Sequence, residues 1–166
     1  MHPNSIAVRV NVGGPSYTDQ EGRSWEADRG YHRGGWGCLS MATTDVLTTA
    51  DPIEGTEDPL LFQAVRMGEE MRYRFDLPDG QYRVRLLFAE IYWESSDAEQ
   101  QDVYLQGKKV LRGFNIFDEV GHDAGLEKTF RIEVTQGVLE IRFVGVSLPM
   151  HSGARVCGID LEVIAE

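Results

Sequence analysis

Two adjacent aromatic residues, Tyr92 and Trp93, end a hydrophobic stretch of the chain. The next eight residues, 94–101, are polar apart from one alanine and offer the two rings nothing to pack against locally. We therefore expect at least one ring to lie near the surface at a strand end. Such rings can stack on a sugar, whose ring faces are apolar and whose rim carries hydroxyl groups. The alternative is that both rings belong to the rim of the core.

A second group of candidates lies in residues 17–37, which combine glycines with two tyrosines and two tryptophans and show no hydrophobic period. A loop of this length without secondary structure is unusual unless it has a function. Tyr31 and Trp36 could form another wall of a sugar site, and Asp28 and Glu90 could hydrogen-bond to hydroxyls. The alternative is an Ω-loop that packs on its own aromatic residues, with Trp25 as its core member.

Catalytic and metal-binding signals are weak. The chain has 27 acidic residues, so a pair of glycosidase-like carboxylates can always be nominated and the signal means nothing. Known nucleophile, zinc and phosphate motifs are missing from the sequence, and its four histidines lack metal-ligand spacing. We therefore expect no catalytic residue and no cofactor. A structural calcium near Asp97, Glu99 and Asp102 is the weaker alternative, because calcium prefers loop carboxylates and carbonyls.

Composition narrows the class of protein. A chain of 166 residues fits one domain covering 1–166. The net charge of −11 argues against nucleic acid or an anionic membrane as the partner. Residues 1–5 do not resemble a signal peptide, so we expect either a cytoplasmic protein or a module excised from a longer secreted chain. Cys38 and Cys157 could pair or remain buried thiols, and their spacing does not decide between these states.

Alternation of apolar and polar residues predicts about eight short strands and no long helix. The expected strands lie at 6–10, 60–66, 71–77, 82–93, within 102–111, and at 130–134, 139–143 and 159–163. Hairpin turns are predicted at 78–80 and at Gly107-Lys108. Residues 38–59 are expected to form a surface loop, although 40–47 could form a helical turn. This pattern is typical of an all-β sandwich.

Several motifs together resemble the malectin domain in order and spacing over nearly the whole chain. They are Arg9-Val10-Asn11-Val12-Gly13-Gly14, Tyr17-Thr18-Asp19, Trp25-Glu26-Ala27-Asp28, Leu61-Phe62-Gln63-Ala64-Val65-Arg66, Tyr73-Arg74-Phe75-Asp76-Leu77-Pro78, Phe88-Ala89-Glu90-Ile91-Tyr92-Trp93, Phe114-Asn115-Ile116-Phe117-Asp118 and Val156-Cys157-Gly158-Ile159. The Phe-Ala-Glu-x-Tyr-aromatic run is the most specific of them.

The resemblance implies a jelly-roll-like antiparallel β-sandwich that binds carbohydrate and is not itself an enzyme. The animal members read glucose-terminated glycans, and bacterial relatives are carbohydrate-binding modules, of the family numbered fifty-seven, often attached to glycoside hydrolases. We therefore expect a gluco-oligosaccharide or polysaccharide ligand and a covalently linked catalytic domain. The localisation is unknown from the sequence, and extracytoplasmic if the chain is a piece of a larger secreted bacterial protein.

The resemblance also implies positions for the sugar site. The family's aromatic pair falls on Tyr92 and Trp93, and a further binding tyrosine falls on Tyr31, with Trp36 as a rival. Another family tyrosine falls on Met67 or the next residue, and the family's binding aspartate falls near Ser152, so both of those contacts are missing here. The expected site lies at one end of the sandwich. It is formed by the loop at 17–36, by Tyr92 and Trp93, and by the loop before Val156, in which Ser152 is included as a carbohydrate-binding residue.

Two other classes remain open at this point. Malectin-like domains also occur in receptor ectodomains, where the partners are proteins or peptides, so a protein-interaction domain is the main alternative. A hydrolytic domain in its own right is the third.

Overall fold

The computed structural model describes residues 6–95, 99–146 and 153–164, which are mostly strands. The strands are β1 (Ala7–Asn11), β2 (Tyr17–Thr18), β3 (Ser24–Ala27), β4 (Trp36–Cys38), β5 (Asp45–Thr48), β6 (Ala64–Gly68), β7 (Glu70–Asp76), β8 (Gly80–Phe88), β9 (Gln101–Leu105), β10 (Lys108–Phe114), β11 (Leu126–Val134), β12 (Val138–Gly145), β13 (Ala154–Val156) and β14 (Gly158–Val163). The helices are short: η1 (Met41–Thr43), η2 (Pro59–Phe62) and α1 (Ile116–Val120).

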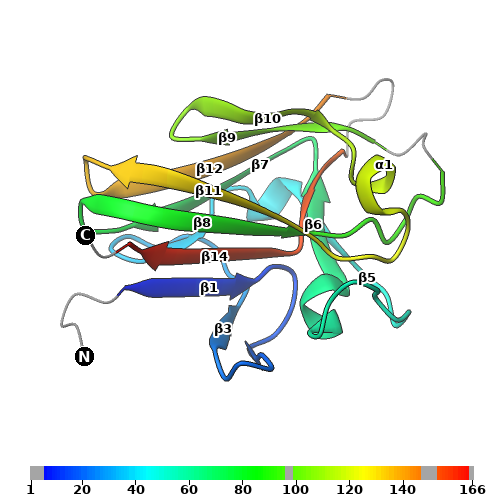
Figure 1. The fold of residues 1–166 in the computed structure, drawn as a ribbon. Helices are drawn as coiled ribbons and strands as arrows, with labels where there is room; N and C mark the ends of the chain where they lie inside the picture. The colour runs from blue at the N-terminus through cyan, green and yellow to red at the C-terminus, as the bar shows by residue number, and fades with distance from the viewer. Residues whose placement is uncertain (1–5, 96–98, 147–152, 165–166) are drawn as a thin grey trace.

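Two sheets form the layers of a sandwich (Figure 1). One sheet has the order β11-β8-β14-β1-β3-β2, and the other has the order β10-β9-β12-β7-β4. A small third sheet, β13-β6-β5, lies at the end of the sandwich where β8 finishes. All strand pairs are antiparallel except β1 with β3. The prediction of an all-β antiparallel sandwich is confirmed.

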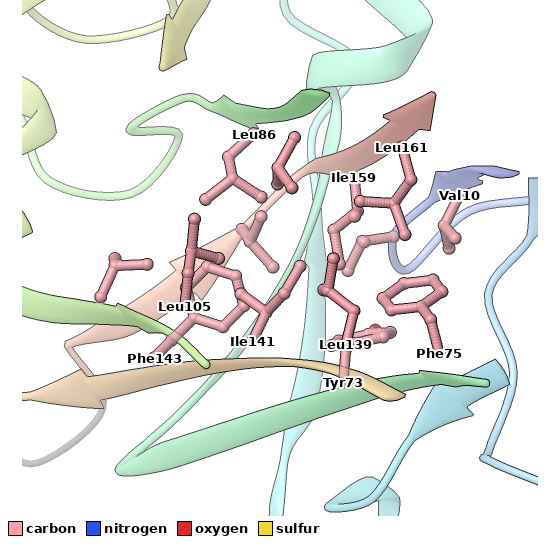
Figure 2. Packing of buried hydrophobic residues seen from close by; sticks show 14 of the residues in the cluster. Val10, Tyr73, Phe75, Leu86, Leu105, Leu139, Ile141, Phe143, Ile159 and Leu161 are labelled. Carbon is pink, nitrogen blue, oxygen red and sulfur yellow. The ribbon is translucent and has the colours of Figure 1, made fainter. Parts of the chain in front are cut away.

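The main core lies between the two large sheets. Tyr73 and Phe75 on β7 are fully buried, while the alternating residues Arg72 and Arg74 point away from the core. This period of two follows from the alternation of side chains along a strand. Figure 2 shows side chains of the two sheets meeting face to face, with Leu86 and Ile159 from one layer opposite residues of the other.

A second, smaller core covers the outer face of the six-stranded sheet. Leu87 lies in it, whereas its neighbours Leu86 and Phe88 lie in the main core, so the end of β8 is buried on both faces. This burial on both faces agrees with the hydrophobic stretch that precedes Tyr92 in the sequence. Trp25 also belongs to the second core and is only 1% exposed, as predicted.

One of the two predicted hairpins is correct and the other is wrong. β9 and β10 pair around Gln106 and Gly107, one residue earlier than the predicted turn at Gly107-Lys108, and the positive φ angles of 52° and 78° suit a type I′ turn. β7 and β8 do not pair: β7 pairs with β12 and β4, and β8 pairs with β11 and β14. The turn at 78–80 therefore carries the chain from one sheet to the other.

Several predicted boundaries also need correction. The central strand ends at Phe88 and does not reach Trp93. The segment predicted as a strand at 60–66 is η2 followed by β6, and the loop at 17–37 contains β2, β3 and the start of β4. The surface loop at 38–59 contains η1 and β5.

The two cysteines are free thiols buried in different clusters, Cys38 in the main core and Cys157 in the second. Burial raises the pKa of the Cys157 thiol. Among the residues described here, no helix is long and apolar enough to cross a membrane.

Candidate functional site

Tyr92 and Trp93 lie just beyond the end of β8, where the chain has left the sheet. Tyr92 is 59% exposed and Trp93 is half-buried. Their ring centroids are 5.0 Å apart and the ring planes meet at 82°, so the two rings pack edge to face. The pair therefore presents aromatic surface at this end of the sandwich, in agreement with the expectation of an exposed ring at a strand end.

Glu90 holds the turn that carries the two rings. Its Oε2 atom accepts hydrogen bonds from the backbone N–H groups of Tyr92 and Trp93, each at 3.1 Å. Glu90 is 0% exposed, so its carboxylate cannot contact a ligand at the surface. This burial does not fit the predicted role of Glu90 as a partner of sugar hydroxyls, and the contacts of its carboxylate support the turn instead.

The Glu90 carboxylate is itself held by a buried arginine that the sequence analysis missed. Arg155 on β13 donates from Nη1 to Glu90 Oε2 at 2.8 Å and from Nη2 to Glu99 Oε2 at 3.0 Å. The backbone of Arg155 exchanges two hydrogen bonds with the Gln101 side chain, both at 3.1 Å. The signal was a single charged residue between apolar neighbours in a short strand, since buried charges are retained only when paired.

The other side of the aromatic turn is held by His122. Its Nδ1 atom lies 2.8 Å from the backbone carbonyl of Trp93, and residues 90 and 122 form an isolated parallel bridge. The next residue, Asp123, donates its backbone N–H to Glu90 O at 3.0 Å. The loop after α1 therefore packs directly beneath the aromatic pair.

His122 also lies in a cluster with Asp123 and Asp51, and one ligand atom from each lies within 4.8 Å of the others. His122 Nε2 is 3.3 Å from Asp123 Oδ2. Burial raises the pKa of Asp123; nearby His122 opposes this, and the carboxylates of Asp51 and Glu94 add to it. The sequence analysis missed this cluster, because Asp51 and His122 are far apart in the chain.

The structure does not bring Tyr31 and Trp36 to the aromatic pair. The Tyr31 hydroxyl donates to Asp76 Oδ2 at 2.5 Å, at the end of β7 from which the chain turns into β8. Tyr92 follows the opposite end of β8, and the eight steps between the nine residues of this strand, at roughly 3.3 Å each, span about 26 Å. The start and the end of β8 lie at opposite ends of the sandwich (Figure 1), so the structure does not place Tyr31 and Trp36 as a wall facing Tyr92 and Trp93.

Tyr31 and Trp36 instead form a local cluster around the β7 end. Trp36 is 6% exposed and stacks on Phe75 at 6.0 Å, while the Arg29 guanidinium lies 3.9 Å from its ring centroid. Trp36 is therefore a core residue. Tyr31 is half-buried, and its hydrogen bond to Asp76 raises the pKa of its hydroxyl.

Asp28 is a structural acceptor and is not open to solvent. Its side chain is 4% exposed and forms an ion pair of 2.9 Å with Arg66. It also accepts hydrogen bonds from the Tyr73 hydroxyl at 2.7 Å and from the Gly13 N–H at 2.8 Å. The predicted contact between Asp28 and sugar hydroxyls does not fit this burial.

The remaining predicted positions are distributed as follows. Ser152 and Asp97 lie outside the described residues. Glu99 pairs with Arg155, whereas Asp102 pairs with Lys109 at 2.9 Å and accepts from Gly113 N at 2.7 Å. These two carboxylates face different partners. The suggested calcium site near them stays a prediction, because Asp97 lies outside the described residues.

Comparison with known proteins finds relatives of this chain by sequence and by fold. Malectin of Mus musculus is 29% identical over 143 residues, which are 84% of this chain and 47% of that protein, and malectin of Homo sapiens matches equally well. The chain spans about half the length of these curated relatives.

Solved structures give the same result. A Bacteroides uniformis beta-glucuronidase is similar with a TM-score of 0.83 and 29% identity, over 96% of this chain and 18% of that chain. The ANX1 ectodomain of Arabidopsis thaliana is similar with a TM-score of 0.82 over 98% of this chain and 49% of that chain, and its 15% identity shows the fold alone.

The family assignment rests on the sequence match. Residues 6–150 match the family described as Malectin domain, which is most of the chain. The predicted resemblance is therefore confirmed, whereas the assignment to the numbered bacterial module family stays a prediction. This chain belongs to the malectin domain family.

Proposed function

We propose that this domain is a noncatalytic carbohydrate-binding module that recognises gluco-oligosaccharides or related glycans through Tyr92 and Trp93. Malectin domains are carbohydrate-binding folds without catalytic activity, which supports the general class. The single observation that carries the proposal for this chain is the exposed aromatic pair, with Tyr92 at 59% exposure on a turn that is held from below.

The geometry of the pair suits a sugar. Two rings at 82° to each other form a corner, so one ring can stack on a pyranose face while the other lies along its edge. The turn is fixed by hydrogen bonds to the buried Glu90 carboxylate, so little conformational entropy is lost when a ligand binds. Polar groups of the neighbouring loops supply hydrogen bonds to the hydroxyls.

The proposal includes a larger parent protein. The similar beta-glucuronidase is a chain of which this domain covers 18%, so a domain with this fold occurs there within a much longer chain. We infer that the present domain is attached to a carbohydrate-active enzyme in the same way and is extracytoplasmic. The enzyme supplies catalysis, and this domain supplies attachment to the polysaccharide.

A glycan array followed by titration calorimetry against α- and β-linked gluco-oligosaccharides tests the proposal. The key variants are Tyr92→Ala and Trp93→Ala, which we expect to weaken binding by about tenfold or more, because a stacked ring contributes on the order of 1 to 3 kcal/mol. The matched control is Tyr31→Ala, which removes another partly exposed tyrosine at the opposite end of the sandwich.

The outcomes distinguish the classes of function. Loss of binding in the first two variants with full binding in the control supports the proposal. Loss of binding in Tyr31→Ala alone would move the site to the other end of the sandwich. An array without glycan binding would favour the protein-interaction alternative, and turnover of a bound glycan would favour a hydrolase.

A further inference from the structure

The cluster of Asp51, His122 and Asp123 lies beside the aromatic turn and is not needed for stacking on a sugar. The three residues come from two loops: Asp51 follows β5, and the other two follow α1. Two backbone hydrogen bonds join these loops, from Glu54 N to Asp123 O at 2.9 Å and from Gly125 N to Glu54 O at 2.8 Å. The cluster is therefore built on a fixed backbone.

The backbone carbonyl of Trp93 sets the tautomer of His122. A carbonyl oxygen only accepts, so the Nδ1 atom 2.8 Å away must carry a hydrogen and donate it. In the neutral ring, Nε2 then has a free lone pair, and this atom faces Asp123 Oδ2 at 3.3 Å. A histidine that donates its second nitrogen to a carbonyl is the usual arrangement of a metal-binding imidazole.

The carboxylates supply the remaining donors. Asp123 Oδ1 is buried and has no hydrogen-bond partner among the described residues, so one oxygen of this side chain lacks the partner that a buried acceptor requires. The Asp51 carboxylate lies in the same cluster and is exposed to solvent. Two carboxylates and one imidazole nitrogen thus converge, with one ligand atom from each within 4.8 Å of the others.

We propose that His122 Nε2, Asp123 and Asp51 bind a divalent transition-metal ion of the zinc type. Zinc bonds to nitrogen and oxygen are about 2.0 to 2.2 Å, so two ligand atoms of a tetrahedral site are roughly 3.3 Å apart. The observed distance of 3.3 Å between His122 Nε2 and Asp123 Oδ2 matches this edge. Imidazole nitrogen favours zinc and its neighbours over calcium and magnesium, which prefer oxygen ligands.

Such an ion would have three protein ligands and an open position on the solvent side, next to the exposed Asp51. It would also fix His122 and, through it, the carbonyl of Trp93. The inference departs from the expectation of no cofactor drawn from the sequence. It does not depend on sugar binding, because the metal is measured directly.

The test is a zinc titration of the chelator-treated protein in a non-coordinating buffer, by calorimetry and by the shift of the thermal midpoint. We expect one ion per chain with a dissociation constant of about 10 μM or tighter and a raised midpoint. Asp51→Asn and His122→Gln should weaken binding by at least about tenfold, because even a change in an outer-shell partner of a metal ligand typically costs about 10- to 100-fold in metal affinity.

Matched controls make the result specific. His32→Gln removes an exposed histidine from the loop at the opposite end, and Asp118→Asn removes an exposed carboxylate from α1; both should bind zinc as the wild type does. Asp51 is exposed, so Asp51→Asn remains informative even if His122→Gln lowers stability.

Three results would overturn the proposal. They are no zinc binding at millimolar concentration, equal binding in wild type and Asp51→Asn, and saturation by calcium without binding of zinc. The first would mean that the cluster holds a shared proton or a His–Asp ion pair, and the second that zinc binds elsewhere on the chain.

Discussion

Replacing Glu90 by alanine should remove the hydrogen bonds that hold the aromatic turn, and thereby weaken sugar binding without removing a side chain that contacts the sugar. The Glu90 Oε2 atom accepts three hydrogen bonds, two from backbone N–H groups at 3.1 Å and one from Arg155 at 2.8 Å. A buried donor without a partner costs about 1 to 3 kcal/mol. The Arg155 guanidinium would still be hydrogen-bonded to Glu99 in the variant. The loss of stability should therefore be smaller than for a buried charge without any partner.

The cost of the unpaired donors and the cost of the small cavity add up. We therefore expect Glu90→Ala to lower the free energy of unfolding by about 3 to 5 kcal/mol. Glu90→Gln is the matched variant. Its amide oxygen can accept the same three hydrogen bonds without the charge, and relief from burying a carboxylate offsets part of the loss, so we expect about 1 to 2 kcal/mol. Urea unfolding measures both values, and glycan titration of the folded variants follows.

The two variants separate a supporting role from direct contact. We expect Glu90→Gln to bind glycan within about threefold of the wild type, because the turn and its rings stay in place. If Glu90→Ala were within about 1 kcal/mol of the wild type, the supporting role would be refuted. If Glu90→Gln kept its stability but lost binding, Glu90 would contact the sugar directly and the burial argument would fail.

Three further predictions concern affinity, pH and thiols. A disaccharide stacked on Tyr92 and Trp93 removes about 100 to 150 Å² of apolar surface from water, which is worth roughly 3 to 4 kcal/mol. Its dissociation constant should therefore lie between about 10 μM and a few mM. A nanomolar value in calorimetry would contradict this site. Burial alone would raise the pKa of Asp19, but hydrogen bonds from Trp25 Nε1 and from Arg23 lower this pKa to about 2. The ionised Asp19 carboxylate therefore contributes up to about 2.5 kcal/mol to the free energy of unfolding. This contribution is present above about pH 4 and is lost as the pH falls towards 2. The stability difference between wild type and Asp19→Asn in urea should therefore shrink over that range, and a constant difference would refute the assignment. The buried thiols of the two cysteines should react with a thiol reagent only on unfolding, and rapid labelling of the native protein would show that their burial is wrong.

The sequence predicted the parts of the fold that depend on local patterns. Burial of Tyr73 and Phe75 followed from the period of two, and the β9–β10 hairpin followed from residues that tolerate positive φ. The turn at 78–80 was assigned correctly as a turn but wrongly as a hairpin. A turn signal shows only that the chain changes direction. Which strands then pair with β7 and β8 depends on distant parts of the chain, here β12 for β7 and β11 and β14 for β8.

The candidate site was predicted in part for a similar reason. The position of Tyr92 at a surface strand end could be predicted from its polar neighbours. The burial of Asp28 and Glu90 could not, because their partners Arg66 and Arg155 are 38 and 65 residues away in the chain. A carboxylate in a loop resembles a free hydrogen-bond acceptor until its distant cation is known.

The turn at residues 90–93 illustrates how the proposed binding surface can be rigid outside a sheet. Its N–H groups donate to the buried Glu90 carboxylate, and its carbonyl at Trp93 is 2.8 Å from His122 Nδ1. In a sheet, a neighbouring strand would form the hydrogen bonds to these backbone groups. Here the side chains of Glu90 and His122 form them instead. Because no strand has to lie beside the turn, the rings of Tyr92 and Trp93 can remain open to a ligand, and the rigidity comes from the buried network beneath them.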